Sequence, residues 1–297
     1  MTSVDLSNSV GPIFWGFVVT TFLTGVAISQ GFYYFRKFGD DTIGIKLMVA
    51  SLVAFTLAET ALSSQLLNYF LIIHFGNIDT LHEFTPSFCA EMICTMLSCL
   101  IGQIFFADQI RLFNWRAWPL SAMISLSALA GFGFGVAGVW LQFSTHLGLY
   151  GTTPKIEWTI GTSLGSSLLS TLLACLSLFR LLATSRIAED YEGQVRMNSV
   201  VDVLVKYTVH RGVLVSLVQS AYLATYLVAP AKPYWVPIHL VLGKVYINTL
   251  LACLNTRKDL RSHMLSQTTS NTLTDMTFRV PQANSHEGDR NTVLEGS

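Results

Sequence analysis

Seven long apolar segments, separated by short polar stretches, dominate the hydropathy pattern of this chain. Each is at least as long as the roughly 20 residues that a helix needs to cross the hydrocarbon core of a bilayer. The segments cover residues 12–35, 43–73, 87–110, 118–143, 158–182, 203–228 and 234–255. The pattern predicts an all-α, polytopic membrane bundle of seven transmembrane helices over residues 12–261. Residues 1–11 form a short extension before it, and residues 262–297 form a tail.

Composition supports a membrane protein and narrows its partners. Hydrophobic residues make up 51% of the chain and charged residues 12%, with a mean hydropathy of +0.49. A soluble domain carries about 25% charged residues, so the lipid bilayer is the expected partner. The formal net charge is zero, which removes the electrostatic case for a nucleic-acid partner.

The Lys and Arg residues that flank the apolar segments predict the orientation of the bundle. Ten of them fall at segment ends that belong to one side: Arg36, Lys37, Arg111, Arg116, Arg180, Arg186, Arg196, Arg257, Lys258 and Arg261. The opposite side has Lys155 and Lys232. Because basic residues concentrate in cytoplasmic loops, we expect the N-terminus outside and the C-terminus in the cytosol. The plasma membrane is the default location, and an organelle membrane is the alternative.

Tryptophans are found near the predicted membrane boundaries. Those near the outer ends are Trp15, Trp140, Trp158 and Trp235, and those near the inner side are Trp115 and Trp118. Such positions are typical of aromatic belts, in which the rings lie at the level of the lipid headgroups.

The two ends of the chain differ in their predicted structure, with a helix near the N-terminus and a disordered tail at the C-terminus. No Lys or Arg precedes the first apolar segment, and this segment is too long for a signal-peptide core, so we expect a retained first helix. Pro12 suits its start. Residues 262–297 are rich in Ser, Thr and Asn and poor in apolar residues, which is typical of a disordered tail. This cytosolic tail is a candidate contact for a partner.

A lysine lies near the centre of the last apolar segment, where a charge is costly. Lys244 there and Glu59, the only charged residue between Lys46 and His74, would each cost about 2.5–3.5 kcal/mol if unpaired. If Lys46 and Arg257 mark the same membrane face, both groups lie 13 residues from it, by 59 − 46 and 257 − 244. Both are then about 20 Å deep. Equal depth allows an ion pair, and a ligand or ion site is the alternative.

Two uncharged residues join this pair as a candidate intramembrane polar site, namely Gln103 and Asn248. A second candidate set consists of basic residues on the cytosolic face: Arg111, Arg211, Arg257, Lys258 and Arg261. Basic side chains at this position suit the headgroups of the inner leaflet. No catalytic residue, metal site or cofactor is predicted, and we do not expect an enzyme.

Two further patterns favour packing over chemistry. Small residues four apart, Gly131 with Gly135 and Gly161 with Gly165, allow helices to approach closely. Four histidines map to the outer side near Glu83, Glu91 and Glu157. Such a set could bind a metal or act as a pH sensor, but the spacing matches no zinc motif. The four histidines are His74, His82, His146 and His239.

Five short motifs resemble a family of fungal seven-helix membrane proteins, abundant in mushroom-forming basidiomycetes, that carry the domain of unknown function 6534. The motifs are residues 46–50 (KLMVA), 74–77 (HFGN), 103–107 (QIFFA) with Arg111, 207–212 (YTVHRG) and 244–257 (KVYINTLLACLNTR). The last is the most specific, and the likeness spans residues 11–261. Relatives often have Asn-Thr in place of His210 and Arg211, and many have aspartate near Glu59. The resemblance implies a polytopic membrane protein and no catalytic activity.

Three functions fit a seven-helix bundle with an outside N-terminus. The leading hypothesis is a receptor-like or sensor protein, although Asp108-Gln-Ile-Arg111 departs from the usual receptor motif. The alternative is a transporter or channel that uses Glu59, Lys244, Gln103 and Asn248 as a polar path. A retinal Schiff base at Lys244 is disfavoured because Leu240 replaces the aspartate that a microbial rhodopsin would have four residues earlier.

Overall fold

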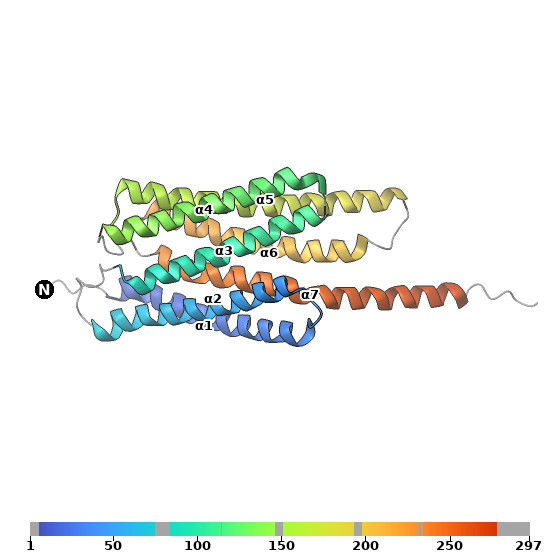
Figure 1. Cartoon of the computed structure of the whole chain (residues 1–297), viewed down its shortest axis with the longest axis horizontal. Helices are drawn as coiled ribbons and strands as arrows, with labels where there is room; N and C mark the ends of the chain where they lie inside the picture. The colour runs from blue at the N-terminus through green and yellow to red at the C-terminus, as the bar shows by residue number, and fades with distance from the viewer. Residues whose placement is uncertain are drawn as a thin grey trace, which may run out of the picture.

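The structure of the protein is a computed structural model that describes residues 6–74, 84–113, 115–145, 151–192, 198–230, 232 and 234–277. The described residues contain helices and no strand (Figure 1). The long helices are α1 (Leu6–Lys37), α2 (Ile43–Asn68), α3 (Pro86–Phe113), α4 (Trp118–Ser144), α5 (Pro154–Glu192), α6 (Asn198–Val228) and α7 (Trp235–Thr277). A π-helical turn, η1 (Tyr69–Ile73), follows α2, and a 3₁₀ turn, η3 (Trp115–Ala117), precedes α4.

Six of these helices are long and apolar enough to cross a membrane. Their apolar spans are Gly11–Lys37, Ile43–Ile73, Pro86–Leu112, Trp115–Ser144, Pro154–Arg180 and Trp235–Arg257. In α6, the described side chains form a shorter apolar stretch, Gly212–Val228. The all-α class and the multi-pass membrane character are therefore confirmed, while the seventh crossing and the orientation stay predictions.

Several helices begin or end outside the predicted segments. Helix α1 begins at Leu6 and contains Pro12 beyond its first turn, so the prediction that Pro12 marks the helix start is wrong. The proline leaves one carbonyl of the helix without its backbone donor. Helix α5 begins at Pro154, with Glu157 in its first turn, where a carboxylate is favoured by the helix dipole. Helix α7 continues to Thr277, past the predicted boundary at residue 261. No Pro or Gly interrupts residues 244–277, so nothing local ends the helix earlier.

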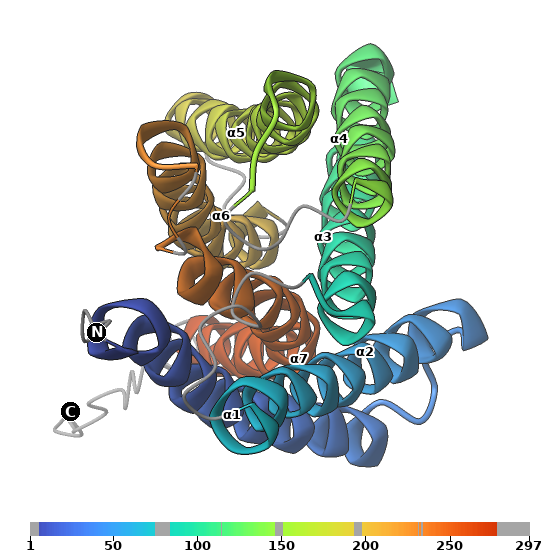
Figure 2. The same ribbon diagram turned by 90° about the vertical axis from the view of Figure 1, so that its left-hand side faces the viewer.

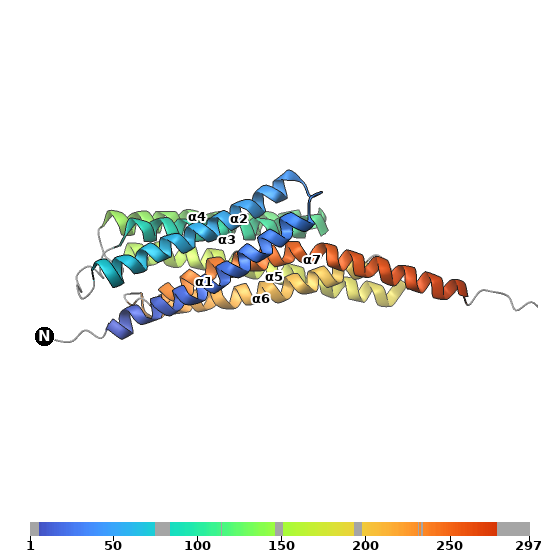
Figure 3. The same cartoon turned by 90° about the horizontal axis from the view of Figure 1, so that it is seen from below.

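The helices form a bundle with α7 at its centre. Figure 2 looks along the bundle and shows α7 enclosed by its neighbours, and it packs against α1, α2, α3 and α6. Over an apolar stretch of 18 residues within its span, 78% of the residues are buried, compared with 22–44% in the corresponding stretches of the other five spans. At the end of the bundle opposite the N-terminus, α7 extends beyond the other helices (Figures 1 and 3).

The outer surface of the bundle is apolar, as contact with lipid requires. Exposed side chains include Phe22, Leu126 and Leu217, each more than 60% accessible. Five of the six tryptophans are also 61–78% exposed. Trp235 departs from the predicted belt because it is 6% exposed and packs inside the bundle.

One of the two predicted small-residue pairs mediates close helix packing. A Cβ atom on Gly131 would lie 3.1 Å from the backbone oxygen of Ser163 and 3.1 Å from the backbone nitrogen of Ser167. Helices α4 and α5 therefore touch through their backbones here. Gly161 and Gly165 make no such approach, since a Cβ on Gly165 would meet nothing within 4 Å.

Candidate functional site

The ion pair between Lys244 and Glu59, which their equal predicted depth made possible, is formed in the core of the bundle. Lys244 Nζ on α7 lies 2.9 Å from Glu59 Oε2 on α2, and the two side chains are 2% and 1% exposed. Lys244 Nζ also donates a hydrogen bond to the Thr56 carbonyl at 2.7 Å, and Ser98 Oγ on α3 donates to Glu59 Oε1 at 2.9 Å. The pair thus links three helices, and both charges have polar partners, as buried charges require.

A glycine lets α7 approach the carboxylate. A Cβ atom on Gly243 would lie 3.1 Å from Glu59 Oε2 and 3.1 Å from Thr95 Oγ1. Any larger residue would press on both polar groups at once. The residue before Lys244 is therefore small because it faces the partner of that lysine.

A second buried acid–base pair lies one to two helical turns away along α7. His239 Nε2 is 3.0 Å from Glu91 Oε2 on α3, with side chains 2% and 1% exposed. Thr95 Oγ1 donates to Glu91 Oε1 at 3.1 Å. The sequence places His239 and Glu91 in the same outer-side set of histidines and acids but does not predict that these two form a pair. Depth counting could have found it, since Glu91 is five residues into α3 from Pro86 and His239 four into α7 from Trp235.

Gln103 belongs to a separate polar network on the other side of α7. Its Nε2 donates to Ser167 Oγ at 2.8 Å and approaches Tyr246 OH at 3.3 Å. Gln219 Nε2 donates to Ser167 Oγ at 2.6 Å, and Tyr246 OH donates to Gln219 Oε1 at 2.9 Å. Thr171 Oγ1 lies 2.6 Å from Tyr246 OH. The network joins α3, α5, α6 and α7, and Gln103 is the one member that the sequence predicts as part of a polar site.

The four predicted polar residues do not line one path. Asn248 Nδ2 donates to the backbone oxygens of Leu23 on α1 and Lys244 on α7, at 3.0 and 2.8 Å. Asn248 therefore faces α1, whereas Lys244 bonds to α2, and Gln103 bonds to α5 and to Tyr246 on α7. Because α7 is central, its polar side chains reach different neighbours.

Two of the predicted basic residues have acidic partners. Arg111 Nη2 lies 2.6 Å from Asp108 Oδ1, and this ion pair is on the surface of the protein. Arg257 Nη2 lies 3.1 Å from Asp41 Oδ2, which also accepts a hydrogen bond from Tyr34 OH at 2.8 Å. The other predicted side chains lie outside the described part of the structure: Arg211, Lys258, Arg261, His82 and His146.

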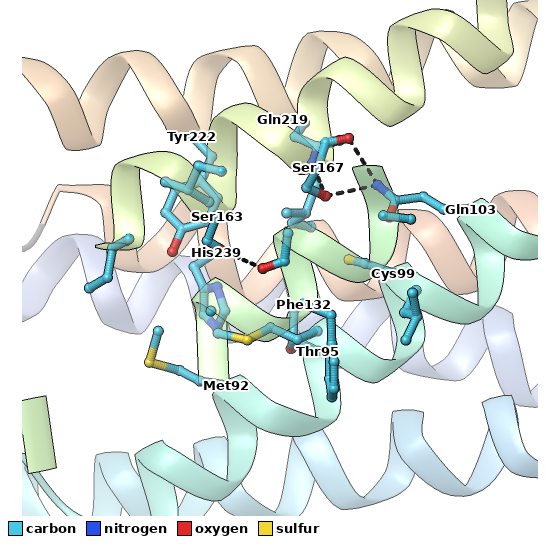
Figure 4. Close-up of a pocket in the computed structure, with 18 of the residues that line it drawn as sticks. Met92, Thr95, Cys99, Gln103, Phe132, Ser163, Ser167, Gln219, Tyr222 and His239 are labelled. Atoms are coloured by element: carbon cyan, nitrogen blue, oxygen red, sulfur yellow. Dashed lines mark hydrogen bonds between the residues drawn. The ribbon is translucent and has the colours of Figure 1, made fainter. Parts of the chain in front are cut away.

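A cavity of about 50 Å³ lies among α3, α4, α5, α6 and α7 (Figure 4). We call it the central cavity. Much of its wall is apolar, and its polar lining includes Gln103, Ser167 and Gln219 from the network and His239 from the second ion pair. Since a water molecule needs roughly 10–15 Å³ of such space, the central cavity has room for a few water-sized groups.

Two smaller cavities lie at the two ends of the central cavity, along the axis of the bundle. The outer cavity, named after the predicted orientation, is about 20 Å³ and lies near the N-terminal end of the bundle; it shares Met92, Val139 and Ile160 with the central cavity. The inner cavity, also about 20 Å³, shares Gln103 with it. Three small spaces are thus arranged in a row between α3 and α5–α7, separated by side chains.

Comparison with known proteins gives a family without an assigned activity. Residues 167–259 match the family described as "Family of unknown function (DUF6534)". The match includes Gln219, His239 and Lys244 and ends before the predicted tail. No curated protein matches the chain. The resemblance to a family of unknown function is supported, while the fungal origin and the seven-helix character of its members stay predictions.

Proposed function

We propose that this protein is a receptor-like membrane sensor, with seven crossings and an outside N-terminus, that binds a small ligand in the central cavity. The observation that carries the proposal is the position of this cavity against the Gln103 network. Ligand sites in helical membrane bundles are concave, mostly apolar spaces with a few placed polar groups. The central cavity has this character, and its polar groups belong to four different helices.

A ligand in this cavity would act on helix packing through hydrogen bonds. Gln103 and Gln219 each donate a hydrogen bond to Ser167 Oγ, and all three residues line the cavity. A ligand that exchanges any of these bonds for its own changes the relative stability of two arrangements of α3, α5 and α6. Such differential contact is what a conformational response requires. The response would reach the inner ends of these helices and the predicted tail.

A cavity-filling substitution tests the sensor proposal. Leu164 on α5 lines the central cavity and is 8% exposed, whereas Leu169 on the same helix faces lipid and is 52% exposed. We expect a library of small molecules to contain compounds that raise the Tm of the wild-type protein in detergent. Leu164→Phe should abolish their effect, and Leu169→Phe should retain it. A library without any stabilising compound, or one whose compounds stabilise both variants equally, contradicts the proposal.

A transporter or channel is the second candidate, and the row of three cavities favours it. A path along this row would pass Met92 at one constriction and Gln103 at the other. It would not contain Glu59, Lys244 or Asn248, in contrast to the predicted path. Flux measurements on reconstituted vesicles distinguish the candidates, because a transporter moves a solute that Gln103→Leu blocks, and a sensor moves none.

A further inference from the structure

Three buried polar atoms near the outer and central cavities have no hydrogen-bond partner among the described residues. They are Trp235 Nε1, Tyr226 OH and His239 Nδ1. Their side chains are 6%, 3% and 2% exposed, respectively. Leaving such a group unpaired costs roughly 1–3 kcal/mol, and native structures keep few of them without a reason.

All three residues border the same pair of cavities. Trp235 and Tyr226 line the outer cavity, and His239 lines the central one. Trp235 is held in place by Tyr222 and Tyr226, with ring centroids 6.1 and 6.0 Å from its own. Met92 lines both cavities, and methionine side chains change rotamer readily. A single molecule can therefore occupy both spaces once Met92 moves.

The charge of the lining selects a neutral molecule. Among the described residues, no Lys, Arg, Asp or Glu side chain lines either cavity. Two carboxylates lie behind the lining: Glu91 is bonded to His239 and Thr95, and Glu157 accepts a hydrogen bond from Thr152. A charged ligand would therefore be buried without a counter-charge, which is prohibitively costly.

The chemistry of the unpaired atoms selects an oxygen acceptor. An indole N–H can only donate a hydrogen bond, and a phenol O–H donates readily. The volumes of about 50 and 20 Å³ correspond to on the order of half a dozen heavy atoms. We propose that the outer and central cavities together bind a small uncharged alcohol or carbonyl compound, whose oxygen accepts hydrogen bonds from Trp235 Nε1 and Tyr226 OH. This proposal rests on the proposed sensor function and names its ligand class.

Two probes of equal size test the role of the oxygen. Cyclopentanone and methylcyclopentane have the same number of heavy atoms and a similar shape, but only the ketone has an acceptor. Each is titrated against the full chain in detergent, and thermal unfolding is followed by circular dichroism. We expect the ketone to raise the Tm at about 25-fold lower concentration than the hydrocarbon, because two buried hydrogen bonds contribute about 1 kcal/mol each.

Conservative variants identify the donors. Tyr226→Phe removes one hydroxyl, so it should weaken ketone binding about fivefold and leave hydrocarbon binding unchanged. Trp235→Phe removes the indole N–H and also ring volume, so its preference for ketone over hydrocarbon is measured and should fall about fivefold. Tyr234→Phe and Trp158→Phe are the matched controls, since Tyr234 is 45% and Trp158 78% exposed. Ligand-free Tyr226→Phe should be at least as stable as the wild type, because the hydroxyl that it removes has no protein partner among the described residues.

Each other outcome overturns the ligand class. Equal effects of ketone and hydrocarbon would show an apolar site without an acceptor contact. No effect of either compound would show that the three atoms are satisfied by water alone. The sensor proposal is judged separately by the Leu164→Phe library experiment. Compounds that depend on Leu164 but not on Tyr226 or Trp235 would keep that proposal and refute this one.

Discussion

At the scale of single residues, the most consequential contact is the pair between Lys244 and Glu59. Removing one partner of a buried ion pair leaves an uncompensated charge, which is far more costly than removing both. Lys244 also donates a hydrogen bond to the Thr56 carbonyl, and Glu59 accepts one from Ser98. Both charged groups of the pair are therefore hydrogen-bonded within the protein. These contacts favour a structural role that holds α2, α3 and α7 together.

A double-mutant cycle measures this role. We expect Glu59→Gln and Lys244→Met each to lower the free energy of unfolding in detergent by about 3–5 kcal/mol. The double variant should recover much of the loss, because no charge is left buried. The surface pair of Asp108 and Arg111, which are 46% and 50% exposed, is the control and should give a coupling below about 1 kcal/mol. Additive losses at Glu59 and Lys244 would contradict a structural pair.

At the scale of the element, α7 differs from the other helices because polar residues occur on several of its faces. His239 reaches α3, Lys244 reaches α2, Tyr246 reaches α5 and α6, and Asn248 reaches α1. A peripheral helix would expose at least one of these groups to lipid, where an unsatisfied polar group costs several kcal/mol. The polar pattern of α7 is therefore compatible with a central position.

The close contact between α4 and α5 at Gly131 can be tested by substituting this glycine. Gly131→Ala places a methyl group 3.1 Å from backbone atoms of α5, which cannot rotate away as a side chain can. We expect a loss of about 1–3 kcal/mol in unfolding free energy. Gly165→Ala on α5, where the added Cβ meets open space, should be neutral or stabilise by up to about 1 kcal/mol. Equal effects of the two substitutions would mean that backbone contact does not limit this seam.

At the scale of the whole molecule, the number of crossings determines where the two ends lie. Seven crossings put the N-terminus and the C-terminus on opposite sides, and six put them on the same side. The basic residues predict that the end of the bundle near residue 40 faces the cytosol and the end near residue 155 faces outward. Asp40 and Lys155 are both exposed, so each is accessible to a reagent.

Cysteine labelling in intact cells tests this topology. In a variant whose five native cysteines are replaced, Lys155→Cys should react with a membrane-impermeant thiol reagent. Asp40→Cys should react only after the membrane is permeabilised. A tag at the N-terminus should be accessible from outside, and a tag at the C-terminus only from inside. Both tags on the same side would contradict seven crossings, and reactive Asp40→Cys in intact cells would contradict the orientation.

The sequence by itself determined the class of the protein and the position of its helices along the chain. Apolar length is sufficient for this, because a backbone in lipid must satisfy its own hydrogen bonds and forms a helix almost regardless of detail. Counting residues from the basic flanks also determined the depth of Glu59 and Lys244. It could have done the same for Glu91 and His239, since depth follows from a rise of about 1.5 Å per residue.

Only the tertiary structure decided which helices face one another. In a membrane protein, lipid is as apolar as the bundle core, so hydrophobic periodicity does not separate the inner face of a helix from the outer one. Trp235 illustrates this, because its position fits an interfacial belt and its side chain is buried. For the same reason the Gln103 network, the direction of Asn248 and the three cavities follow from lateral packing, which sequence position does not encode locally.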